Sequence, residues 1–103
     1  MIHVIATIQA REGQLDKLTA AFRTIVFSTR KKAGCIEYSL AAHLSSGLPG
    51  QAPFNCDELV IVEKWTDLDA LKAHIADPDY RARFTGVWDW VAGASMQIFE
   101  AID

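Results

Sequence analysis

One run of β-forming residues, from Leu59 to Trp65, limits the folds open to this chain more than any other segment. Apolar side chains occupy both faces of the expected strand, because Leu59 and Ile61 point to one side while Val60 and Val62 point to the other. An antiparallel sheet with helices on one face normally alternates apolar and polar residues. Both faces of this strand therefore need a cover, and helices of the same chain supply only one.

The remaining elements follow from apolar periodicity and from turn residues. A capping-box-like pair, Thr66 with Asp69, begins a helical segment that Asp77-Pro78 breaks in two. Gly34 and Gly93 are expected to end helices. The patterns predict strands at 2–9, 35–43, 57–65 and 95–102, a helix at 14–32, and helical segments on either side of residue 78. This β-α-β-β-α-β order predicts an α+β, ferredoxin-like fold with a four-stranded antiparallel sheet and helices on one face.

Length and charge bound the class of protein. With 103 residues, one domain spanning 1–103 is expected. The net charge is −3 and no basic stripe is present, so nucleic-acid binding is not expected. The one cationic run, Arg30 to Lys32, lies where the first helix should end, and the helix dipole favours cations there. No apolar stretch approaches the roughly 20 residues of a membrane span, and no charged signal region precedes the first strand. A cytoplasmic location is therefore expected.

Cysteine spacing gives no sign of a metal or disulfide site. Cys35 and Cys56 begin two antiparallel strands, so they lie at opposite ends of the pair and a disulfide is not expected. No His, Cys, Asp and Glu cluster has metal-ligand spacing, and no Gly-rich phosphate loop is present. The sequence thus predicts neither a metal site nor a cofactor.

The cover for the second face of the sheet is expected to be another copy of the chain. The last strand is also apolar on both sides, with Met96 and Ile98 opposed to Phe99 and Ala101. Two such strands favour a homodimer packed sheet to sheet. The alternative is a monomer that tolerates a few surface apolar residues.

An ordered set of short motifs resembles a known family. The set is Gly13 after the first strand, Gly34-Cys35-Ile36-x-Tyr38, Glu63-x-Trp65, and then Leu71, His74 and Pro78. It resembles the antibiotic biosynthesis monooxygenase family of small dimeric α+β barrel proteins, over nearly the whole chain. Membership would imply the fold and the dimer strongly and the reaction weakly, because the family includes quinol oxygenases, haem-degrading enzymes and an isomerase of a signal molecule. The chain lacks the Trp and His of the haem-degrading branch near positions 74 and 84, so haem degradation is not expected.

Two ionisable residues are the candidates for catalysis. The strand end and the helix start bring Glu63, Trp65 and His74 near one another. His74 borders an apolar helix face and titrates near neutral pH, so it suits proton transfer, although a structural histidine is the plainer interpretation. Glu63 shares a strand face with Ile61 and Trp65, where burial would raise its pKa. A buried Glu63 would then orient His74 or act as a base. The alternative is that its carboxylate pairs with a basic group or the backbone of a neighbouring strand.

A small-molecule pocket is expected between the sheet and its own helices. The long loop from Leu44 to Asn55 would either border it or be a surface insertion. The favoured function is a cofactor-free monooxygenase that oxidises a small aromatic quinol or phenol, with His74 as the preferred base. The alternatives are a proton-shuttling isomerase of a small carbonyl compound and a non-catalytic, ligand-binding or stress-associated dimer. The expected pocket walls are Phe22, Tyr38, Ile61, Trp65, Ile75, Phe84 and Trp88.

Overall fold

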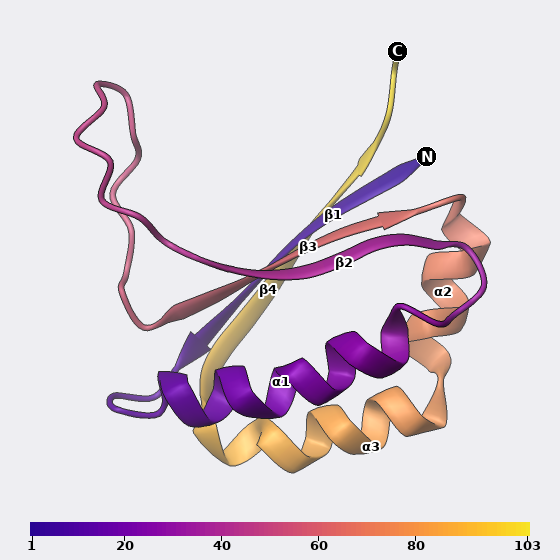
Figure 1. Cartoon of the computed structure of the whole chain (residues 1–103), viewed down its shortest axis with the longest axis horizontal. Coiled ribbons are helices and arrows are strands. Elements are labelled where there is room, and N and C mark those ends of the chain that lie inside the picture. Colours follow the sequence, from indigo (N-terminus) through magenta and orange to yellow (C-terminus); the bar gives the residue numbers. More distant parts are fainter.

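The computed structural model describes residues 1–103 and contains one antiparallel sheet with its helices on one side (Figure 1). The strands are β1 (Ile2–Ala10), β2 (Cys35–Ala42), β3 (Glu58–Trp65) and β4 (Val91–Glu100). The helices are α1 (Leu15–Thr29), α2 (Leu68–Ala76) and α3 (Pro78–Val87), followed by a 3-10 turn, Trp88–Trp90. The strand order β2-β3-β1-β4 confirms the ferredoxin-like α+β fold. None of the helices combines the length and apolar character that a bilayer span requires.

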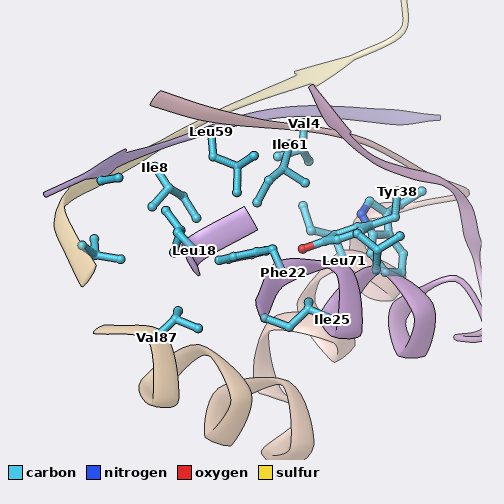
Figure 2. Packing of buried hydrophobic residues seen from close by; sticks show 14 of the residues in the cluster. Val4, Ile8, Leu18, Phe22, Ile25, Tyr38, Leu59, Ile61, Leu71 and Val87 are labelled. Atoms are coloured by element: carbon cyan, nitrogen blue, oxygen red, sulfur yellow. The ribbon is translucent and has the colours of Figure 1, made fainter. Parts of the chain in front are cut away.

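The core fills the space between the sheet and α1. Figure 2 shows Val4, Leu59 and Ile61 pointing from the sheet toward Leu18 and Phe22 of α1. Strict alternation along β3 produces this arrangement, because every second residue, ending with Glu63 and Trp65, is buried against the helices. The same alternation carries a carboxylate into the layer beneath the helices.

The turn from α1 into β2 depends on Gly34. Its φ is +80°, and a Cβ there would lie 2.6 Å from Ala70 Cβ and 2.8 Å from Thr66 Oγ1. The amide of Thr66 also donates to the Gly34 carbonyl, at 2.9 Å. Gly34 therefore fixes the contact between this turn and the start of α2, while α1 itself ends earlier, at Thr29, than the predicted 32.

Two local predictions were wrong. The N-cap of α2 is Asp67, whose side chain accepts from the Ala70 amide at 2.8 Å, and not Thr66. Gly93 lies inside β4, which begins at Val91, because the 3-10 turn and not a glycine ends the helical segment. A bulge in β2 between Cys35 and Glu37 leaves Ile36 exposed while Tyr38 is buried.

The outer face of the sheet is partly apolar and lies open. Ile5 pairs with Val62, Thr7 with Val60, and His3 with Phe99, so apolar side chains of three strands lie side by side on this face. On edge strand β4, Phe99 of the outer face is 49% exposed. Met96 and Ile98, which lie on the helix side of the same strand, are 47% and 48% exposed. Apolar residues thus lie on both faces of β4, as the sequence indicated.

Candidate active site

A cavity of about 320 Å³ lies on the helix side of the sheet, between β1, β3 and β4 and helices α2 and α3. Nine of its twelve lining residues are hydrophobic, and the other three are Glu63, His74 and Ser95. Apolar walls with a few convergent polar groups are typical of a small-molecule site.

Glu63 brings a carboxyl group to this cavity from β3. Glu63 is only 5% exposed, and its Oε1 accepts a hydrogen bond from Trp65 Nε1 at 3.0 Å. Burial raises the pKa of Glu63 from 4.5 to about 7, although the bond from Trp65 opposes the change. A carboxyl group poised near neutral pH can both accept and return a proton.

His74 reaches the cavity from α2 and is 2% exposed. Its ring stacks on Trp65 with centroids 4.9 Å apart, and the rings of Tyr80 and Tyr38 lie at 4.2 Å and 5.5 Å. Burial and the nearby Lys32 cation lower the pKa of His74 from 6.5 to about 4, while Asp77 acts in the opposite direction. The imidazole is therefore neutral at pH 7.

Lys32 joins the site from the turn after α1. Its Nζ lies 2.8 Å from Nδ1 of His74 and 2.8 Å from Oδ2 of Asp77, and 5.3 Å from the centre of the Tyr80 ring. The bond from Lys32 lowers the pKa of the Asp77 carboxyl. This lysine therefore has a specific partner at the site, beyond the helix-end role that the sequence suggested.

Three of the seven expected wall residues line the cavity, and four do not. Ile61, Ile75 and Phe84 line the cavity together with Glu63 and His74.

The other four do not line it. Trp65 and Tyr38 lie behind His74, and Phe22 is a core residue whose ring meets Phe84 edge-on at 6.0 Å. Trp88 is 53% exposed and contacts the Phe84 ring from the surface, at 5.6 Å.

Sequence reasoning left out several residues of this site. Tyr80 lines the cavity, and burial with the nearby Glu63 raises its pKa to about 12. Ser95 and Met96 of β4 close one side. The helical spacing of Tyr80 with Phe84 was a usable signal for Tyr80, whereas no sequence pattern links Lys32 to His74.

The long loop between β2 and β3 does not line the cavity. It extends beyond the end of the sheet that lies away from α2 (Figure 1). Its base is fixed by His43, which stacks on Phe54 at 4.6 Å and contacts Glu58 Oε2 at 2.8 Å. No group of three His, Cys, Asp or Glu side chains is arranged to hold a metal ion.

Comparison with known proteins identifies the family. Residues 1–85 match the model of a family described as antibiotic biosynthesis monooxygenase. The chain belongs to this family. A protein of Escherichia coli K12 named probable quinol monooxygenase YgiN is 33% identical over 104 residues, covering 97% of each chain. The antibiotic biosynthesis monooxygenase family assignment confirms the enzyme class expected from the sequence, an oxidoreductase of the monooxygenase type.

Solved structures agree on the fold of this family member. A candidate antibiotic biosynthesis monooxygenase from Deinococcus radiodurans superimposes with a TM-score of 0.84 at 22% identity, over 100% of this chain and 94% of the other. SnoaB of Streptomyces nogalater, described as a cofactor-independent oxygenase, gives 0.79 at 15% identity, over 99% and 93%. At these identities the likeness establishes the fold alone.

Proposed function

We propose that this chain is a cofactor-independent monooxygenase that oxidises a small aromatic quinol or phenol with O₂. The observation that carries the proposal is the cavity itself, with nine hydrophobic lining residues around Glu63, His74 and Ser95. Its volume of about 320 Å³ suits a ligand of one or two aromatic rings. The relative named probable quinol monooxygenase supports this class.

Glu63 is the better proton acceptor of the two candidates, so the sequence-based preference for His74 changes. A base works best when its pKa lies near the operating pH, and Glu63 has a pKa of about 7. His74 has a pKa of about 4, and its Nδ1 already faces the Lys32 ammonium. Glu63 then takes the proton, and His74 contacts the resulting anion.

The proposed reaction balances without a further reductant. Glu63 takes the phenolic proton, and the electron-rich anion gives one electron to O₂. The substrate radical and superoxide combine into a C–O bond, and the peroxide regains the proton from Glu63. The O–O bond then breaks, the ring carbon that carries the peroxide loses its hydrogen, and one water leaves. The sum is quinol plus O₂ giving a hydroxyquinone plus water. The chain contributes the apolar enclosure, the orientation and the base.

Oxygen uptake by purified protein freed of metal and flavin tests this proposal. With an aromatic quinol, wild type should consume O₂ above the uncatalysed rate, and Glu63→Gln should lose most of that activity. Glu58→Gln is the matched control, because Glu58 lies on the same strand but on the other face, beside His43. Turnover that persists without O₂ would refute the proposal and favour an isomerase, and binding without chemistry would favour a ligand-binding module.

We also propose that residues 1–103 form one domain and that two copies pair through the outer sheet face. The apolar side chains of Ile5, Val60, Val62 and Phe99 on that face support the pairing. Sedimentation should give twice the chain mass of 11.4 kDa, and Val62→Lys should weaken the pairing. A stable single subunit would refute the proposed dimer.

The free Cys35 and Cys56 fit a reducing cytoplasm, which we propose as the location.

A further inference from the structure

We propose that Lys32 is a positioning residue that holds His74 as a hydrogen-bond donor toward the ligand in the cavity. The inference deepens the proposed function and rests on it. It begins from three side chains that converge from different elements: Lys32 from the turn after α1, His74 from α2, and Asp77 from the joint between α2 and α3.

The charge of Lys32 decides which nitrogen of His74 carries the proton. Lys32 Nζ forms an ion pair with a carboxylate oxygen of Asp77 at 2.8 Å, as an ammonium group does. An ammonium group has only donors, so Nδ1 of His74, also 2.8 Å away, must accept. A neutral imidazole that accepts at Nδ1 carries its hydrogen on Nε2. The nitrogen left free for a ligand is therefore an N–H donor.

The packing around the imidazole holds the ring in place. Trp65 stacks on it at 4.9 Å, Tyr80 covers it at 4.2 Å, and Tyr38 meets it edge-on at 5.5 Å. The ionisable groups around it are Lys32 from the α1–β2 turn, Asp77 from the α2–α3 joint, Glu63 from β3, Tyr38 from β2 and Tyr80 from α3. Lys32 is the only cation among them.

In this arrangement Glu63 and His74 have different roles toward the substrate. Glu63 accepts the phenolic proton, and the Nε2–H of His74 then donates to the substrate oxygen, where negative charge develops. The ammonium of Lys32 stands behind the ring and disfavours an imidazolium. Without Lys32, Nδ1 loses its donor, so the ring can take up either tautomer or a second proton. Lys32 would therefore act on the substrate only through His74.

Ring ¹⁵N NMR of His74 in the full-length protein without substrate tests the tautomer directly. Wild type should show a protonated Nε2 and a bare Nδ1, with no protonation of the ring from pH 8 down to 5.5. Lys32→Met should raise the pKa of His74 and mix the tautomers, and Lys32→Arg should restore the wild-type signature. Lys31→Met is the matched control, because Lys31 lies over the Phe27 ring at 4.0 Å and is not hydrogen-bonded to His74.

Binding of 4-nitrophenol gives a second measurement, because its ionised form absorbs at its own wavelength. The phenolate should bind about two- to tenfold more weakly to Lys32→Met than to wild type, because only the part of the His74 population that carries its hydrogen on Nε2 can donate to it. Lys31→Met should leave its affinity unchanged. A wild-type His74 that carries its proton on Nδ1 would overturn the inference without any variant, as would equal effects of the Lys31 and Lys32 changes. If the tautomer is as stated but no O₂ is consumed, the proposed function fails and the assignment of Lys32 to His74 stands.

Discussion

Replacing Glu63 with Gln should change how the free energy of unfolding depends on pH. In the folded chain, burial raises the pKa of Glu63 from 4.5 to about 7. Between these values the folded chain keeps a proton that the unfolded chain has released, so stability falls as pH rises. At about 1.4 kcal/mol per pH unit, the interval from 4.5 to about 7 amounts to about 3 kcal/mol.

His74 acts in the opposite direction over nearly the same range. Burial lowers its pKa from 6.5 to about 4, so the unfolded chain binds a proton that the folded chain does not, and stability rises with pH. The two slopes cancel between pH 4.5 and 6.5 in wild type. Glu63→Gln leaves the His74 slope alone, so the variant should gain about 3 kcal/mol relative to wild type between pH 4.5 and 8.

Urea denaturation followed by tryptophan fluorescence at pH 4.5, 6 and 8 measures this difference, at one fixed protein concentration because of the proposed dimer. The buried Gln amide adds an offset that does not depend on pH, so the trend with pH carries the result. A constant difference between variant and wild type from pH 4.5 to 8 would show that Glu63 has an ordinary pKa. Glu63 could then not be the base whose pKa lies near neutral pH.

Three further predictions follow from local geometry. The kcat/KM for a quinol should rise from pH 6 to 8 with an inflection near 7, because Glu63 must be ionised to accept a proton; a profile flat across this range would exclude that role. Gly34→Ala should lose at least ~1 kcal/mol more stability in urea than Gly13→Ala, since both have positive φ but only Gly34 has Ala70 Cβ 2.6 Å from the added carbon; equal losses would contradict the contact. Asp67→Ala should cost about 1 kcal/mol and Asp69→Ala a few tenths at most, because Asp67 caps α2; the reverse order in thermal melts would restore the Thr66 capping box.

Local periodicity was enough to predict the fold and the placement of Glu63. A strand alternates its faces every residue, so the apolar neighbours of Glu63 already indicated that its carboxyl lies under the helices. Helix boundaries were harder, because Thr66 and Asp67 are both good caps and only the backbone geometry decides between them. The length of α1 was overestimated for a similar reason, since Gly34 serves the turn and its contact with α2.

The finer structure of the site needed tertiary information. Phe22, one of the expected wall residues, does lie in the core beneath the helices, but the sequence could not tell the residues that touch the cavity from those packed behind them. Lys32 and His74 are 42 residues apart in the sequence, and their contact depends on how the α1–β2 turn lies against α2. In the sequence, Lys32 reads as one cation of a helix end, so its partner could not be predicted.

Isotope labelling of the product tests the central claim most directly, namely that the cavity carries out monooxygenation with O₂ and no cofactor. Metal-free and flavin-free protein would be given an aromatic quinol under ¹⁸O₂ in ordinary water. One ¹⁸O atom per product molecule, with the second recovered as water, is the expected result. An unlabelled product, or one whose new oxygen comes from the solvent, would contradict the account.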